Sequence, residues 1–177
     1  HRAHLVAFIA APGIPSLPQR ADWTLITTPV DATNAVTLKA YRKLASSEGA
    51  SWTWTLGTSQ RNWGWVGAYT GVDPDDPVNA SATDLTLDTS TIISVDVGAI
   101  PGYGAGIGSA AAVRTASGSA TTWTHTSTVE DADLSTNAGA GTDIAGVVAH
   151  RIWSIEDPSS GYLPTATASQ TQTAGVG

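Results

Sequence analysis

The sequence predicts an all-β protein, a two-sheet antiparallel β-sandwich of jelly-roll type, and three observations lead to this prediction. Apolar and polar residues alternate with a period of two in many short segments, as in strands with one buried face. Gly, Pro, Asp and Ser residues separate these segments. No sustained apolar stripe of helical period occurs, since the most helix-compatible stretch, residues 108–113, is too short to be stable alone.

The first three strands are predicted at residues 4–11, 23–28 and 35–45. Residues 4–11 are almost continuously apolar, which indicates a buried strand, and the prolines that follow end it because proline lacks a ladder donor. Residues 35–45 alternate between a mostly apolar face and a face that carries Lys39 and Lys43. This pattern predicts a sheet with one face in water.

Two tryptophan-rich segments follow and are predicted to form a hairpin. Residues 51–56 place Trp52, Trp54 and Leu56 on one face, and residues 61–70 do the same with Trp63, Trp65 and Tyr69. Residues 57–60 between them have the length of a hairpin connection. The four tryptophans are therefore expected on two neighbouring strands.

The same alternation predicts further strands, at residues 83–87, 91–97, 107–115, 121–129, 143–155 and 165–173. This makes about ten strands in all, with residues 101–108, rich in glycine, as a flexible loop. We expect one domain over residues 1–177. Because the strand pattern begins and ends abruptly, we also expect this domain to be part of a longer polypeptide.

Composition excludes several classes of function. The formal net charge is -7 with 8 Lys and Arg residues, whereas a nucleic-acid partner requires clustered basic side chains. No apolar run approaches the roughly 20 residues that cross a bilayer. The absence of cysteine excludes a Cys nucleophile, a disulfide scaffold and a Cys-ligated metal site. We therefore expect no nucleic-acid partner and no membrane insertion.

No motif for catalysis is present, so the sequence predicts a non-enzymatic protein. The Gly-x-Ser-x-Gly elbow and the His-Glu-x-x-His zinc motif are absent. Of the four histidines, His1, His4, His125 and His150, the first two stand three residues apart at an end that we expect to fray. A glycosidase with two facing carboxylates is the least favoured alternative, because the acidic residues fall almost wholly in predicted turns.

Two acidic runs raise the question of calcium. Asp73, Asp75 and Asp76 follow one predicted strand, and residues 130–133 follow another. Asp-rich loops can supply the oxygen ligands that calcium prefers, although Asp beside Pro is equally a turn former. The sequence therefore leaves calcium at Asp73, Asp75 and Asp76 as a minor alternative and predicts no other cofactor.

Seven tryptophans make a large share for this length, and five of them are candidate ligand-binding residues: Trp52, Trp54, Trp63, Trp65 and Trp123. The rigid face of tryptophan buries a large area at small entropic cost, which suits a sugar or a partner surface. Tryptophan is also a good core residue, and Leu56 on the face of Trp52 and Trp54 favours the core. A carbohydrate-binding module with a Trp platform and a calcium loop is the alternative function.

Residues 41–49 (YRKLASSEG), 51–55 (SWTWT) and 63–73 (WGWVGAYTGVD) resemble β-sandwich modules of bacteriophage virion proteins, tail-associated or capsid-decorating, and related secreted proteins of high-GC bacteria. The likeness spans nearly the whole chain and transfers no catalytic residue. It implies a structural or adhesion protein of the virion or the extracellular space. The implied partners are other virion proteins or copies of the chain itself, with a cell-surface glycan as a further candidate.

Overall fold

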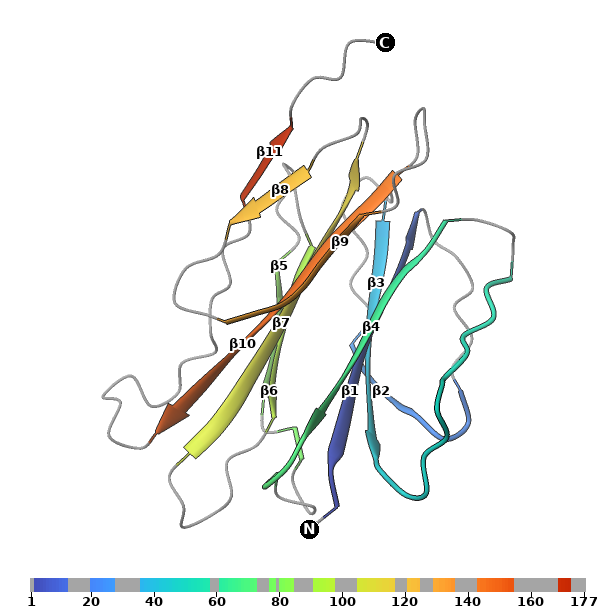
Figure 1. The fold of residues 1–177 in the computed structure, drawn as a ribbon, viewed down its shortest axis with the longest axis vertical. Coiled ribbons are helices and arrows are strands. Elements are labelled where there is room, and N and C mark those ends of the chain that lie inside the picture. Colours follow the sequence, from blue (N-terminus) through green and yellow to red (C-terminus); the bar gives the residue numbers. More distant parts are fainter. Residues whose placement is uncertain are drawn as a thin grey trace.

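The computed structural model describes residues 2–12, 20–27, 36–57, 61–72, 77–78, 80–84, 91–97, 105–116, 121–124, 129–135, 143–154 and 169–172. These residues contain eleven strands and no helix (Figure 1). Every pairing between the described strands is antiparallel. The prediction of an all-β protein is therefore confirmed for the described part of the chain.

The strands form three sheets. The first sheet has the order β2-β3-β1-β4, with β1 at His4–Pro12, β2 at Thr24–Thr27, β3 at Val36–Leu44 and β4 at Trp63–Tyr69. The second has the order β5-β6-β7-β10-β9, with β5 at Ala80–Asp84, β6 at Thr91–Val97, β7 at Ala105–Ala116, β9 at Val129–Ser135 and β10 at Asp143–Ser154. The third pairs β8 (Thr121–Thr124) with β11 (Ser169–Gln172).

Most predicted strands agree with these elements, but two expectations in the second half of the chain are wrong. The segment predicted as one strand at residues 121–129 contains β8 and the first residue of β9, and these two strands belong to different sheets. Residues 105 and 106, predicted to lie in the flexible loop before the strand at 107–115, belong to β7, where they pair with β10. Small residues such as glycine can extend a strand when its partner supplies the ladder, so composition alone misplaced this boundary.

The first sheet is buried on both faces. On one face Val6, Phe8 and Ala10 of β1 pack with Leu38 and Ala40 of β3. The other face presents a second apolar cluster, made of Leu5, Ala7 and Ile9 with Tyr41 and Trp23. The prediction that this sheet has one face in water is therefore wrong. Tyr41, on the face of Lys39 and Lys43, is fully buried, because tryptophans from outside the sheet cover it.

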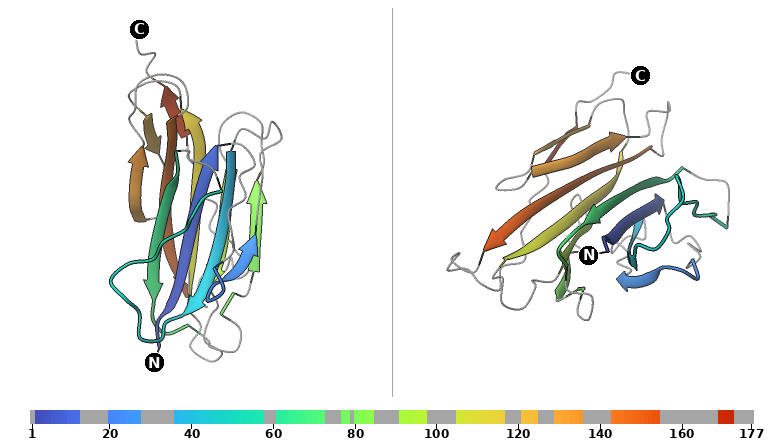
Figure 2. Two further views of the ribbon diagram at one scale, coloured as in Figure 1. Left: turned by 90° about the vertical axis from the view of Figure 1, so that its right-hand side faces the viewer. Right: turned by 60° about the horizontal axis from the view of Figure 1, so that its bottom comes forward.

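The second sheet contacts the face of the first that carries Phe8. Val148 of β10 belongs to the same apolar cluster as Val6 and Phe8. The ring of Trp63 lies directly on Gly146, so close that a Cβ atom at this glycine would approach the ring to 2.5 Å. β4 also contacts β9, and β1 and β3 contact β7, as the neighbouring ribbons in Figure 2 show. Apolar contacts thus join the first and second sheets, and among them the indole ring of Trp63 packs against Gly146.

Residues 45–57, which we call the strap, run outside the first sheet. Residues 51–56 form no strand, and the described partner of β4 is β1, so the predicted hairpin of two tryptophan strands is wrong. The alternation that suggested a strand is real, however: Trp52, Trp54 and Leu56 are partly buried, and the residues between them are exposed. The strap is an extended segment that packs on the sheet through every second side chain.

Candidate functional site

The predicted tryptophan residues divide between the two faces of the first sheet. Trp52 and Trp54 of the strap pack on the cluster of Leu5, Ala7 and Ile9. Trp63 and Trp65 of β4 pack on the opposite cluster, with Trp63 4% exposed and Trp65 partly buried. They therefore form neither one core layer nor one exposed platform. Trp123 lies in β8, where its backbone pairs with Gln170. The structure describes the backbone of Trp123 but not its side chain.

A pocket of about 380 Å³ lies between the strap and β4. We call this cavity the tryptophan pocket. The described residues that line it are Ile9, Trp52, Thr53, Trp54, Leu56, Asn62, Trp63, Gly64, Trp65 and Val66. None of these ten residues carries a charge. The volume falls in the lower part of the range of about 300–1,000 Å³ that is typical of small-molecule sites.

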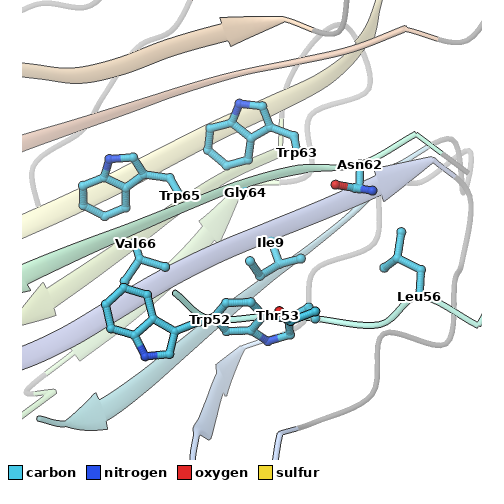
Figure 3. Close-up of a pocket in the computed structure, with 10 residues that line it drawn as sticks. Ile9, Trp52, Thr53, Leu56, Asn62, Trp63, Gly64, Trp65 and Val66 are labelled. Carbon is cyan, nitrogen blue, oxygen red and sulfur yellow. The ribbon is translucent and has the colours of Figure 1, made fainter. Parts of the chain in front are cut away.

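The side chains of the lining do not all face the pocket. Figure 3 shows the rings of Trp63 and Trp65 on one side of β4, and Trp52, Ile9 and Val66 on the other. This follows from the alternation of β4, which places Gly64 and Val66 opposite to Trp63 and Trp65. Gly64 lies beside Ile9 on the pocket side, where a Cβ atom would come within 3.1 Å of Ile9 Cδ1. Trp52 and Trp54 are therefore the tryptophans whose rings line the pocket side of the sheet.

A charged cluster holds one end of the strap. The ammonium group of Lys43 donates to Asp22 at 2.8 Å and to Glu48 at 3.0 Å. Arg20 pairs with the same Asp22 at 3.1 Å. Ser47, between Lys43 and Glu48, takes a left-handed conformation with φ 55°, which forms the tight turn that returns Glu48 to the sheet. The cluster joins β3, the segment before β2, and the strap.

Glu48 is the carboxylate that connects this cluster to the pocket. It accepts hydrogen bonds from the backbone N–H of Ser46 at 2.9 Å and from the indole Nε1 of Trp52 at 3.0 Å. These two bonds, with the Lys43 ammonium, lower the pKa of Glu48 to about 2. Hydrogen bonds from Arg20 and Lys43 lower the pKa of Asp22 as well. In turn, the bond between Lys43 and Asp22 raises the pKa of Lys43. At neutral pH Asp22 and Glu48 are therefore anions and Lys43 is a cation.

The middle of the strap is held by Arg20 and by aromatic contacts. Arg20 donates to the carbonyl oxygen of Thr53 at 2.9 Å, and its guanidinium lies 5.6 Å from the ring centroid of Trp54. The ring centroid of Trp23 lies 5.2 Å from that of Trp54. It lies 6.3 Å from that of Trp52, whose ring it meets edge-on. Both pocket tryptophans thus have several fixed neighbours, so their orientation is set before any ligand arrives.

The acidic residues give a mixed outcome. Asp73, Asp75 and Asp76 lie outside the described residues, so their calcium site stays a prediction. Residues 130–133, expected in a loop after a strand, instead lie inside β9. Asp131 stands at the irregularity where β9 shifts against β10, and it pairs with His150 Nδ1 at 2.7 Å. Within the parts of the chain that are described, no group of three or more potential ligands could hold a metal ion.

His4 does not lie at a frayed end as expected. It is 2% exposed, in β1, in register with Leu44 of β3 and Tyr69 of β4. Neither ring nitrogen has a hydrogen-bond partner. Burial, together with the charge of Arg42, lowers the pKa of His4. The side chain is consequently neutral at pH 7 and part of the packing of the sheet.

Sequence reasoning missed the residues that position the pocket, namely Arg20, Asp22, Lys43 and Glu48. Asp22 and Lys43 are 21 residues apart, and no local pattern connects them. The signal that could have found them is the pairing of β2 with β3, which places Thr24 opposite Arg42 and so brings the preceding acidic residue near the end of β3. That pairing is not visible in the periodicity of either strand alone.

Comparisons with family models, with curated proteins and with solved structures found no match to this chain. In the described part of the chain, no helix is long and apolar enough to cross a membrane.

Proposed function

We propose that this chain is a non-enzymatic attachment or assembly module of a virion surface, folded as a two-sheet antiparallel sandwich of jelly-roll type. The observation that carries the proposal is the tryptophan pocket. It holds partly exposed aromatic side chains in fixed positions on a sheet that is buried on both faces. Rigid aromatic side chains are enriched in binding surfaces because they bury area with little loss of conformational entropy.

The sandwich is supported by the contacts between the two larger sheets. Val148 of β10 shares an apolar cluster with Phe8 of β1, and Trp63 of β4 rests on Gly146 of β10. Two sheets that face each other across interdigitated apolar side chains make such a core. The partners that we propose are other virion proteins or further copies of the chain, in the virion or the extracellular space.

The proposal is tested by locating the chain in its native setting. Antibodies raised against the purified chain are applied to density-gradient fractions from a culture that produces virus particles with this protein. We expect the chain to sediment with assembled particles, at a fixed ratio to the main capsid or tail protein. A chain found as a lone monomer in the medium, absent from purified particles, would contradict the proposal.

A free carbohydrate-binding module is the second candidate. The uncharged lining of the tryptophan pocket, which combines the polar residue Asn62 with aromatic residues, favours it. The same gradient separates the two candidates, because such a module acts without a particle. The calcium loop that the sequence adds to this alternative, at Asp73, Asp75 and Asp76, is tested by titrating the purified chain with Ca²⁺ in a calorimeter.

A further inference from the structure

We propose that the tryptophan pocket is a site for a neutral saccharide of one or two rings, with Trp52 as its stacking surface and Glu48 as the residue that positions Trp52. The inference deepens the proposed attachment function, on which it rests, by naming the ligand class of the pocket.

The charges around the pocket indicate a neutral ligand. Arg20 and Lys43 stand close to the strap, but Asp22 and Glu48 already neutralise them at distances of 2.8 to 3.1 Å. The ten described lining residues contribute no charged group. An anionic sugar would therefore lose its hydration without gaining a counter-charge, and on Trp52 it would approach the carboxylate of Glu48 that bonds this indole.

The chemistry of the lining matches a sugar ring better than a wholly apolar molecule. A pyranose presents C–H groups on its face and hydroxyl groups at its edge, so it needs an apolar plane beside polar atoms. The indole of Trp52 and the side chains of Ile9 and Val66 offer the apolar part. Asn62 and the exposed backbone at Gly64 offer the polar part, whereas the Thr53 side chain alternates away from the face of Trp52. Gly64 is exposed, and Ile9 Cδ1 packs close to where its Cβ atom would lie.

Trp52 is the tryptophan best placed to act as the stacking surface. Its side chain is partly exposed, and Figure 3 places it on the pocket side of β4, together with Ile9 and Val66. One edge of the indole is held by the hydrogen bond to Glu48 at 3.0 Å. Trp54 is less available, because Arg20 lies over its ring and Tyr41 and Trp23 pack against it.

Glu48 is a positioning residue in this proposal. It does not line the pocket, but it fixes the indole of Trp52, and it is itself fixed by Ser46 and Lys43. A ring that is held in its binding orientation loses little conformational entropy when the ligand stacks on it. Removing the acceptor should therefore weaken binding even though no contact with the ligand is lost.

The experiment titrates the purified chain with panels of saccharides and peptides, followed by calorimetry and tryptophan fluorescence. The panels are neutral hexose disaccharides, the matching uronic acids and sulfated sugars, and an apolar peptide, each raised to about 10 mM so that a Kd near 1 mM is detected. We expect saturable binding of at least one neutral saccharide, with at least tenfold weaker binding of its acidic counterpart.

Variants locate the site. Trp52→Ala should weaken binding by about tenfold or more, whereas Leu44→Ala, which changes an exposed side chain outside the pocket lining, should stay within about twofold of the parent chain. Glu48→Ala should weaken binding about threefold to tenfold. Glu48→Gln, whose amide oxygen still accepts from the indole, should restore affinity to within about twofold. Circular dichroism and urea midpoints check that each variant is folded, and Trp52→Phe replaces Trp52→Ala if the latter is not.

Three results would overturn the proposal: no neutral saccharide in the panel binds to the folded chain, the acidic sugars or the peptide bind instead, or binding is unchanged in Trp52→Ala and in Trp52→Phe. These failures are separate from failure of the virion proposal. A chain that sediments with particles but binds no saccharide refutes the ligand and keeps the assembly role.

Discussion

His4 illustrates, at the level of one side chain, how this fold opposes ionisation. The imidazole is buried without a hydrogen-bond partner, so its pKa in the folded chain lies below the ordinary value of 6.5. As the pH falls, the unfolded chain therefore binds the proton first. The free energy of unfolding should decrease from about pH 6.5 downward until the folded pKa is reached, by about 1.4 kcal/mol for each unit between the two pKa values.

The substitution His4→Phe tests this pH dependence. Because Phe cannot be protonated, the loss of melting temperature between pH 7.5 and pH 5 should be smaller in this variant than in the parent chain. His150→Gln serves as the control, since His150 is partly exposed and paired with Asp131, and its removal should leave the contribution of His4 in place. An unchanged pH dependence in His4→Phe would show that His4 is not the group responsible.

Gly146 is a second residue where a single atom decides the packing. A Cβ atom there would come within 2.5 to 2.8 Å of three atoms of the Trp63 ring, which is 4% exposed and has little room to move. We expect Gly146→Ala to lower the free energy of unfolding by about 1–3 kcal/mol, as in other overpacked cores. Urea denaturation measures this change.

Gly49→Ala is the matched control for that substitution. A Cβ atom at Gly49, in the strap, meets nothing within 4 Å, so this change should shift stability by less than about 1 kcal/mol, and in the stabilising direction if at all. Equal effects of the two substitutions would mean that Trp63 does not rest on Gly146.

The strap is the element whose character could not be derived from the sequence. Its alternation correctly indicated that Trp52, Trp54 and Leu56 share one side, because side-chain direction alternates in any extended chain. The same alternation says nothing of whether the backbone pairs with a neighbour. Residues 51–56 of the strap pair with no strand and pack through their side chains, with the Thr53 carbonyl bonded to Arg20, whereas β4 with a similar pattern pairs with β1.

Hydrogen exchange should separate the strap from the strands. The amides of residues 51–56 take part in no ladder, so we expect them to exchange much faster than those of β1, which lies between two strands. Exchange measured by mass spectrometry on overlapping peptides checks this expectation. Protection of residues 51–56 equal to that of β1 would contradict it and would point to backbone pairing of the strap.

Long-range contacts account for the rest of what sequence reasoning missed at the site. The four strands of the first sheet followed from polarity, since their buried faces are apolar, whereas the strand predicted at residues 51–56 did not form. The cluster of Asp22, Lys43 and Glu48 depends instead on which strands become neighbours. Likewise the acidic run at residues 130–133 resembled a turn, although the β9 backbone and the Asp131–His150 pair hold it in a sheet. Local composition does not contain that information.

At the scale of the whole molecule, the proposed sandwich makes a prediction about cooperativity. If the two larger sheets share one core, they should unfold together, because neither buries its apolar face alone. Tryptophan fluorescence, to which Trp23, just before β2, and the four tryptophans of the strap and β4 contribute, should then give the same urea midpoint as far-UV circular dichroism, which follows all strands. Two separated midpoints would show that the first sheet unfolds independently.

Burial of β1 on both faces also has a consequence for how the chain finds its alignment. In most strands a slip of one residue would move apolar side chains into water, and that cost selects the correct pairing. In β1 residues 4–11 are all buried, so a slip exchanges one apolar face for another. The correct alignment must then be recognised by size, with small Ala7, Ala10 and Ala11 set against bulky Phe8 and Ile9. Substitutions that make these side chains similar in size should therefore allow β1 to pair with its neighbours in more than one register, even when the strand stays equally hydrophobic.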